Sequence, residues 1–272
     1  MKNLFFSVTL LVIGIDMITA QSNDETQYKK EFDELMKLPW KVAFNDPCTK
    51  DWQKNWHKDG NVATVENTPL GMEVRAGTHI PDPTHAVVMW IKRDFQGDLK
   101  IEYDFTSIDT IKIAGVNILY MHAQGSGTVP YEQDIFKWND LRVEPLMPVY
   151  HRNMILYHIS YAVKGSNSLH GGTEYVRARR YDPDSPWETN STALKPDYDQ
   201  VGIWEHGVKY RMTIIKRGQI LYMHAKGENG KERTFFFDGR DLPPLPLEEG
   251  KIGVRQQNGR WSVYANFTVS EI

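Results

Sequence analysis

"YRMTIIKRGQILYMHAKG", residues 210–227, holds two runs of β-branched, aromatic and apolar residues joined at Gly218. Two such runs on either side of a short glycine turn predict a β-hairpin. Nine further runs of the same kind are bounded by Gly, Pro, Asp or Asn, at residues 71–77, 85–93, 99–106, 115–125, 153–163, 173–181, 233–239, 250–257 and 260–269. So many short strands in one chain predict an all-β, two-sheet sandwich of the jelly-roll kind.

The start of the chain differs from the rest. Lys2 precedes the apolar run "LFFSVTLLVIGI", and Ala20 stands where a signal peptidase would cut. This pattern predicts a signal peptide over residues 1–20, because the run is too short to span a bilayer comfortably. We expect residues 21–272 to form a single exported domain, periplasmic or secreted. Apolar residues at helical spacing within 24–38 predict a short N-terminal helix before the strands.

Composition excludes several partner classes. The net charge of −3 gives no electrostatic case for nucleic acid or an anionic membrane. Cys48 is the only cysteine, so no intrachain disulfide can form, and we interpret it as a buried small side chain. Aromatic residues make up 12% of the chain, a composition that suits stacking against sugar rings.

Candidate functional groups lie on alternate positions of the predicted strands. In "YMHAQG", residues 120–125, strand alternation places Tyr120, His122 and Gln124 on one face. In "YVRARRY", residues 175–181, the same rule groups Arg177 and Arg179 with two tyrosines.

Two further strands extend this set. "GKIGVRQQ", residues 250–257, places Arg255 with Gly253 and Gln257. "YHISYA", residues 157–162, offers two alternatives, with Tyr157 and Tyr161 on one face and His158 and Ser160 on the other. If these arginine, histidine and tyrosine side chains face the same way, they form an electropositive groove that suits an acidic sugar. The alternative is that the arginines pair with acidic residues on an outer sheet.

Such a groove contains the groups that β-elimination on a uronic acid requires. Arginine or an amide neutralises the carboxylate, a histidine or tyrosine takes the C5 proton, and a tyrosine or histidine protonates the oxygen that leaves C4. Glycoside hydrolysis needs two carboxylates instead. "KIEYDFT", residues 100–106, offers Glu102 and Asp104 on one face but no third carboxylate, and we interpret this face as solvated.

Several stretches taken together resemble a known family: "FNDPCTKDW", "HAVVMWIKRDFQGDLKIEYDFT", "VNILYMHAQG", "YHISYA", "YVRARRY" and "GKIGVRQQNGRWSVYANFTV". The resemblance covers about residues 40–270. The family consists of secreted bacterial proteins catalogued as a domain of unknown function. They are similar to concanavalin-like jelly rolls and belong to gene sets for degradation of acidic plant and algal polysaccharides.

The resemblance implies the activity of an ulvan oligosaccharide dehydratase. This carbon–oxygen lyase expels water from the non-reducing-end uronate and leaves an unsaturated sugar. The matching positions are His85, His122, Gln124, His158, Arg177, Arg179 and Arg255. In this interpretation Gln124 and the arginines hold the carboxylate or a sulfate. His122 or His158 is the base, and Tyr120 or Tyr157 is the acid.

Alternatives remain open at this point. One is a chain-cleaving polysaccharide lyase, and another is a non-catalytic carbohydrate-binding protein that stacks sugar on Trp138 or Trp187. The chain has "RQQ" where the family continues with an "RHM"-like segment, and a glutamine cannot replace a histidine as a base. We expect an acidic oligosaccharide partner, no nucleic acid, no membrane after signal cleavage and no cofactor, with structural calcium left open.

Overall fold

The computed structural model describes residues 24–79, 81–109, 115–163, 174–185, 192–245 and 247–272. The chain divides into two compact units, Met1–Pro39 and Trp40–Ile272. The described part of the first unit forms a helix over residues 24–36, as predicted. Lys29 and Asp33, which lie one turn apart, form an ion pair at 2.6 Å that stabilises this helix. The predicted signal peptide lies outside the described residues.

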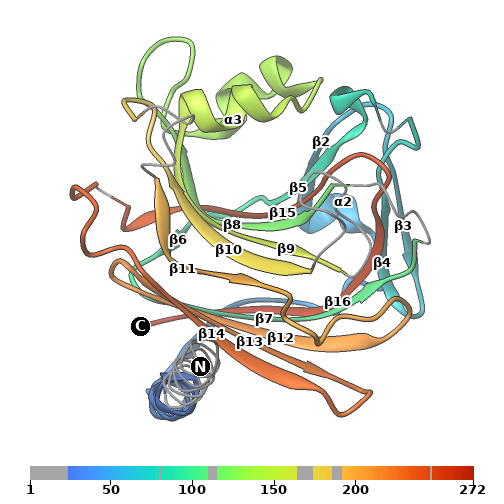
Figure 1. The fold of residues 1–272 in the computed structure, drawn as a ribbon. Helices are drawn as coiled ribbons and strands as arrows, with labels where there is room; N and C mark the ends of the chain where they lie inside the picture. Colours follow the sequence, from blue (N-terminus) through green and yellow to red (C-terminus); the bar gives the residue numbers. More distant parts are fainter. Residues whose placement is uncertain (1–23, 80, 110–114, 164–173, 186–191, 246) are drawn as a thin grey trace, which may run out of the picture. The chain divides into compact units, whose positions relative to one another are not determined.

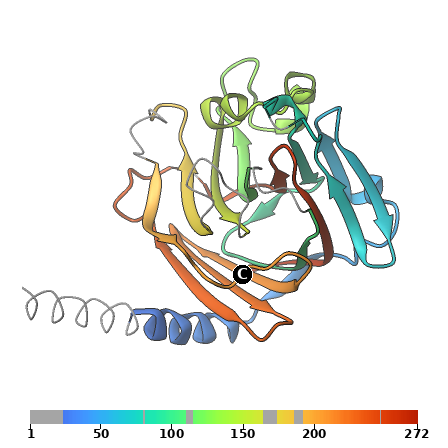
Figure 2. The same ribbon diagram turned by 45° about the vertical axis from the view of Figure 1, so that its right-hand side comes forward.

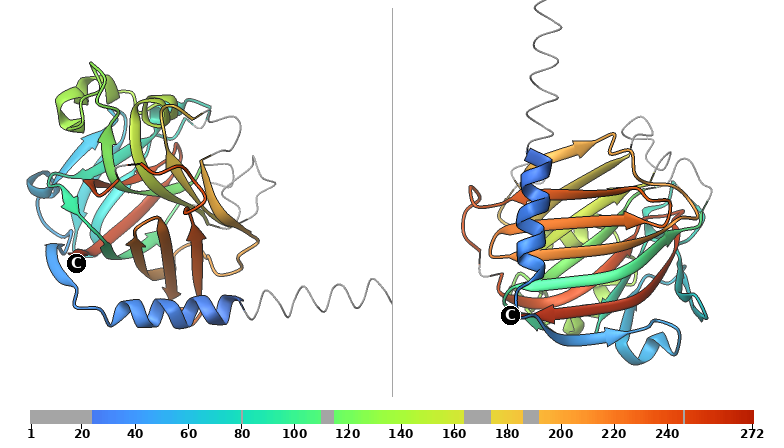
Figure 3. Two further views of the ribbon diagram at one scale, coloured as in Figure 1. Left: turned by 90° about the vertical axis from the view of Figure 1, so that its left-hand side faces the viewer. Right: turned by 90° about the horizontal axis from the view of Figure 1, so that it is seen from below.

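Two antiparallel sheets build the second unit (Figures 1 and 2). The front sheet has the order β2 (Trp56–Asp59), β5 (Val87–Ile91), β15 (Glu249–Gln256), β8 (Asn117–Gly125), β9 (Met154–Ala162), β10 (Tyr175–Tyr181) and β11 (Ala193–Asp199). The back sheet, seen face-on in Figure 3, has the order β14 (Glu232–Asp238), β13 (Ile220–Gly227), β12 (Lys209–Arg217), β7 (Leu99–Ser107), β16 (Trp261–Glu271), β4 (Gly71–Arg75) and β3 (Thr64–Thr68).

Three connections complete the strand order. β1 (Lys41–Asp46) pairs with β16, and the short β6 (Phe95–Gln96) pairs with β15. The two sheets are linked by the pairing of Lys195 on β11 with Asp238 on β14. This arrangement confirms the predicted all-β jelly-roll sandwich.

Apolar side chains from both sheets fill the space between them. On β7, Ile101, Tyr103 and Phe105 point inward and are fully buried. Tyr103 stacks on Phe267 of β16 with ring centroids 5.1 Å apart. The intervening Glu102 and Asp104 face outward, as alternation predicts. This core fixes which face each front-sheet strand turns outward.

A second buried cluster lies on the outer face of the front sheet. Two helical segments, η2 (Ile135–Arg142) and α3 (Met147–Asn153), cover it (Figure 1). The sequence did not predict this cover, because the segment is short and lacks a helical apolar repeat. In the sequence, Pro148 indicates the start of α3, because the fixed φ angle of proline suits the first turn of a helix. Two other short helices are α2 (Trp52–Asn55) and η1 (Pro83–His85).

The stretch 182–200 is polar and proline-rich, a composition that predicts one long surface loop, but part of it forms a strand. The strand is β11, which pairs with β10 at Ala193–Leu194 and again at Tyr198–Asp199, while Lys195 between them meets β14. Proline at 196 is tolerated there because a strand that changes partners does not need every ladder hydrogen bond. The sequence also gave no strong signal for β1, β2, β3 and β6, which are short.

Candidate functional site

A row of paired residues crosses the outer face of the front sheet. Arg179 on β10 pairs with His158 on β9, and His158 pairs with Tyr120 on β8. Tyr120 pairs with Gly253 on β15, which pairs with Trp90 on β5. Directly paired residues of antiparallel strands share a face. The side chains of Arg179, His158 and Tyr120 therefore lie on the same face of the front sheet.

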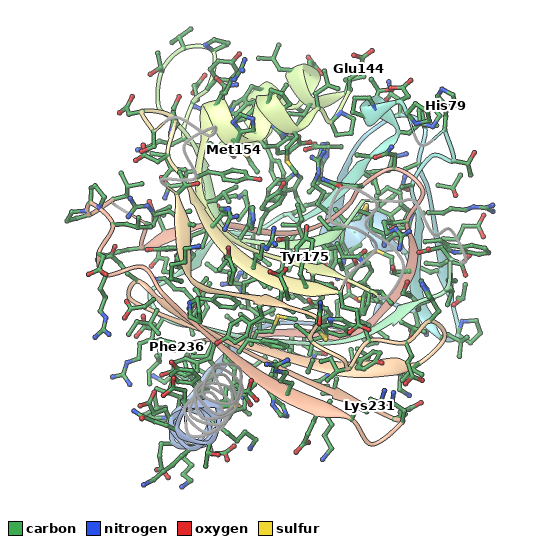
Figure 4. The ribbon with its side chains drawn as sticks, viewed as in Figure 1. His79, Glu144, Met154, Tyr175, Lys231 and Phe236 are labelled. Carbon is green, nitrogen blue, oxygen red and sulfur yellow. The ribbon has the colours of Figure 1, made fainter. Side chains whose placement is uncertain are left out.

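A second row lies beside the first. It runs from Arg177 on β10 through Ser160 on β9 and Ile118 on β8 to Arg255 on β15. Arg177 and Arg255 therefore share the outer face with His158, as the predicted groove requires. Side chains of this face, with Tyr175 labelled on β10 and Met154 on β9, can be followed in Figure 4.

Aromatic rings form a stack in the middle of this face. Trp90 stacks on Tyr120 with centroids 5.4 Å apart and planes 15° apart, and Tyr120 stacks on Tyr150 of α3 at 6.1 Å and 10°. Gly253 makes room for this stack, since a Cβ there would lie 2.4 Å from Cε3 of Trp90. The glycine on β15 is thus required by the tryptophan beside it.

Hydrogen bonds to Asp59 on β2 connect the covering segments η2 and α3 to the front sheet. Its buried Oδ2 accepts hydrogen bonds from Trp90 Nε1 at 2.7 Å, Arg142 Nε at 2.7 Å and Tyr150 Oη at 2.9 Å. Charge-assisted bonds of this length are the stronger class of protein hydrogen bond. Sequence reasoning missed Asp59, Trp90, Arg142 and Tyr150, because no local spacing links residues that are 31 to 91 positions apart.

Arg255 and His158 each bury nitrogen atoms on this covered face. Arg255 is 2% exposed, lies over the ring of Tyr150 at 4.7 Å and donates through Nη2 to the carbonyl of Pro145 at 2.6 Å. Its Nε and Nη1, and Nδ1 of the buried His158, have no hydrogen-bond partner within the described ranges. Buried polar groups are ordinarily satisfied, so these atoms indicate a place for a ligand or water.

The ionisation of the site follows from its burial. Burial lowers the pKa of His158 well below its usual range, and the charges of Arg179 and Arg255 lower it further. Burial raises the pKa of Tyr120, an effect that the charge of Arg255 opposes, and it raises the pKa of Tyr181 well above its usual value. At neutral pH the site therefore offers a neutral imidazole beside protonated phenols and a cation.

Arg177 and Arg179 stand at the more open side of the face. Arg177 contacts Asp199 at 2.8 Å and lies over the ring of Tyr175 at 4.6 Å, while Arg179 reaches Asp197 at 3.5 Å. Both alternatives from the sequence are thus partly realised, because the arginines share the outer face of the front sheet with His158 and also have acidic neighbours on β11. Their side chains keep 18% and 14% exposure.

His122 does not share a face with Tyr120, and the prediction that it does is wrong. The backbone of His122 has a φ of 52°, and the pairing of β8 with β9 shifts between Met121 and Gln124. Such a bulge breaks strict alternation. The imidazole is fully buried, with Nδ1 3.1 Å from the carbonyl of Leu247 in the core between the sheets. Burial, followed by the charge of Lys216, lowers its pKa to about 3.

Tyr157 and Gln124 also lie away from the two rows. Tyr157 points into the core between the sheets, so the alternative that groups His158 with Ser160 is correct. The side chain of Gln124 donates to the carbonyl of Glu249 at 2.7 Å. It lines a different, open hollow of about 860 Å³ together with Gln133 and Glu271. The predicted grouping of Gln124 with the arginines is therefore wrong.

His85 and Trp138 occupy other positions. His85 belongs to η1, where its Nδ1 accepts a hydrogen bond from the backbone of His79 at 3.1 Å. Trp138 lies in η2, is 3% exposed and is covered by Arg142 at 4.3 Å, so it offers no exposed ring for stacking. Trp187 lies outside the described residues.

The carboxylates of β7 are engaged on the back sheet. Arg211 lies 3.6 Å from Glu102 and 3.2 Å from Asp104, and Lys100 lies 3.0 Å from Glu102. Both carboxylates of β7 are therefore held in ion pairs with basic neighbours. Cys48 is 1% exposed, and burial raises its pKa to about 12, which agrees with its interpretation as an unreactive core side chain.

Two absences hold for the part of the chain that the structure describes. No group of three or more His, Cys, Asp or Glu side chains there is arranged to hold a metal ion. No helix in the same ranges is both long and apolar enough to cross a membrane.

Comparison with known proteins defines the class of fold. No protein-family model and no curated protein sequence matches this chain. Among solved structures, it is similar to a protein of unknown function with a galectin-like fold from Bacillus subtilis, with a TM-score of 0.60 and 20% identity over 85% of this chain and 98% of that chain.

Two further solved structures are also similar. The exoplasmic/lumenal domain of VIP36, in a form bound to Ca²⁺ and Man3GlcNAc, matches with a TM-score of 0.55 and 10% identity over 85% of this chain and 91% of that chain. Peanut lectin matches with a TM-score of 0.52 and 12% identity over 85% of this chain and 97% of that chain. At these identities the likeness concerns the fold alone. The chain is a lectin-like jelly-roll sandwich.

Proposed function

We propose that the outer face of the front sheet binds an acidic carbohydrate. The observation that carries the proposal is the set of buried nitrogen atoms of Arg255 and His158 that have no hydrogen-bond partner among the described residues, with Arg179 paired directly to His158 on the next strand. A buried guanidinium group whose N–H donors are not all used favours binding of an anionic oxygen. A carboxylate or a sulfate group has such oxygens.

The carbohydrate part of the proposal has separate support. The Trp90–Tyr120–Tyr150 stack is fully buried, so it holds the face rigid from beneath and does not itself contact a sugar. The similar solved structures include a lectin and a domain in a form bound to Man3GlcNAc. Because one fold hosts many functions, the site carries the proposal and the fold only supports it.

Elimination on the bound uronate is the second candidate function, favoured by the contact between His158 and Tyr181 at 5.0 Å. The neutral imidazole of His158 takes the proton from C5, and the freed electron pair forms the C4–C5 double bond. The C4–oxygen bond breaks, and a phenol of Tyr181 or Tyr120 protonates the departing oxygen. The proton then returns from the imidazolium to the phenolate through solvent. Arg255 stabilises the charge that develops on the carboxylate.

The leaving group decides between two reactions. Loss of water from a terminal uronate makes the protein a dehydratase, and loss of a sugar makes it a chain-cleaving lyase. Ulvan oligosaccharides are the proposed substrate on the strength of the sequence resemblance, and the same resemblance supports a role in polysaccharide degradation outside the cytoplasm, after removal of the signal peptide.

A product mass spectrum separates these functions. The protein is mixed with short ulvan oligosaccharides, and ultraviolet absorbance is followed in parallel, because an unsaturated uronate absorbs and its precursor does not. A product lighter by one water at unchanged chain length supports dehydration. Two fragments, one unsaturated, support chain cleavage. An unaltered spectrum with saturable binding leaves carbohydrate binding as the function, and absence of both overturns the proposal for this sugar.

A further inference from the structure

A second group of arginines lies at the junction of β4 and β16. Arg75, the last residue of β4, pairs with Trp261, the first residue of β16. Its guanidinium carbon lies 4.5 Å from the centre of the indole ring. Arg260 precedes Trp261 and is fully buried. Neither arginine belongs to the two rows on the front sheet.

These residues line a cavity of about 210 Å³ together with Thr78 and Asp109. At ~30 Å³ per molecule in the liquid, this space equals roughly seven waters. It is large enough for a sulfate group or the carboxylate end of a sugar. Arg75 is exposed at the surface, whereas Arg260 lies inside, so the cavity joins a buried cation to solvent.

The charges around the cavity favour an anion. Nη1 of Arg260 lies 3.1 Å from Oδ1 of Asp109, and the other oxygen of Asp109 accepts hydrogen bonds from Ser107 and from the backbone of Trp261. Glu73 accepts the indole N–H of Trp261 at 2.8 Å. Asp109, the acidic side chain of the lining, is thus ion-paired with Arg260, and Arg75 is the second cation of the lining.

Burial strengthens this preference. It lowers the pKa of Arg260, and Asp109 counteracts the effect, as expected for a cation held in a poorly solvated place. Charges attract each other more strongly where water is excluded. Arginine also offers a planar fork that fits carboxylate and sulfate oxygens.

We propose that the cavity between Arg75 and Arg260 is a second oxyanion-binding site, which takes a carboxylate or a sulfate ester. The identification of its natural ligand as a further unit of the acidic carbohydrate rests on the proposed function. β15 supports that link, because it carries Arg255 on the front sheet and ends four residues before Arg260.

The test uses inorganic sulfate and glucuronate as probes of the full protein, with sodium chloride at matched ionic strength as the reference. The readout is the indole N–H signal of Trp261 in a nitrogen–proton correlation spectrum, assigned by its loss in Trp261→Phe. We expect a saturable shift with sulfate, glucuronate or both, and the responding probe identifies sulfate ester or carboxylate as the ligand. No response beyond that of chloride overturns the proposal.

Variants connect the response to the cavity. Arg75→Ala should weaken the apparent affinity about tenfold, since a charge-assisted contact is lost. Arg75 is exposed, so this variant is expected to fold even if substitution of Arg260 is not tolerated. Arg217→Ala, which removes another exposed arginine, on β12, is the control and should leave the shift unchanged. Undiminished affinity in Arg75→Ala overturns the proposal.

The outcome is independent of the first site. If the proposed function is wrong, Arg179→Ala should bind oligosaccharides as tightly as the unaltered protein does. The response of the Trp261 signal to sulfate, in contrast, reports only on the second cavity. A retained Trp261 response together with lost oligosaccharide binding supports both sites. A lost Trp261 response in Arg179→Ala contradicts a separate second site.

Discussion

The rings of His158 and Tyr181 meet edge to face, with centroids 5.0 Å apart and planes at 85°. They lie on neighbouring strands of the front sheet, and both are buried on its outer face. The contact places a neutral imidazole next to a protonated phenol, with Arg179 and Arg255 close enough to influence the imidazole. This relationship underlies the proposed acid–base chemistry and the first of the predictions.

Replacement of His158 by glutamine should remove elimination and keep carbohydrate binding. A general base typically contributes about 10² to 10⁴ in rate, so the absorbance signal should fall by at least ~100-fold. Glutamine retains size and hydrogen bonding, and the melting temperature reports whether the fold survives. His79→Gln, an exposed substitution in the loop before η1, is the control and should retain full turnover. Normal turnover in His158→Gln would exclude this residue as the base.

The stability of the protein should fall as the pH drops below about 6.5. Burial lowers the folded-state pKa of His158 well below 6.5 and that of His122 to about 3, whereas both histidines titrate near 6.5 when unfolded. Below 6.5 the unfolded chain therefore binds protons that the folded chain does not, which favours unfolding.

Each of these two histidines lowers the free energy of unfolding by about 1.4 kcal/mol for each pH unit below 6.5, until the pH reaches its folded-state pKa. Urea unfolding between pH 4 and 6 measures the slope. In His158→Gln it should be smaller by about one such contribution. Equal slopes for the two proteins would show that His158 is not held neutral by the fold.

Removal of Asp59 should destabilise the cover over the front sheet. Asp59→Ala leaves the buried Arg142 without its carboxylate and leaves two further donors unsatisfied. Loss of one partner from a buried ion pair typically costs about 3–5 kcal/mol. Urea unfolding measures the change. Glu228→Ala, which breaks an exposed pair with Lys209, should cost at most about 1 kcal/mol and serves as the control.

Addition of one methyl group at Gly253 should disturb the aromatic stack. The new Cβ of Gly253→Ala would lie 2.4 Å from Trp90, so the indole must move away from Tyr120. Overpacking of this kind costs about 1–3 kcal/mol. The double variant with Trp90→Leu tests the mechanism, because the added methyl should cost much less once the indole is gone. An equal cost in both backgrounds would assign the effect to the backbone of β15.

The sequence predicted the sandwich well, because each main strand carries its own alternation of buried and outward side chains. The same alternation placed Arg177 and Arg179 correctly on one face. It failed at His122, where a bulge turns the imidazole into the core, and a bulge has no reliable signal in one sequence. The bonds from Asp59 to Arg142 and Tyr150 were beyond prediction, since they depend on how distant segments fold together.

The most direct test of the central claim is a calorimetric titration of short uronate-containing oligosaccharides into the protein and into Arg179→Ala. Arg217→Ala is the matched control, because it removes an exposed arginine of the back sheet. We predict saturable binding to the unaltered protein and to the control, with affinity at least about tenfold weaker for Arg179→Ala. Equal affinity for all three proteins would contradict acidic-carbohydrate binding on the outer face of the front sheet.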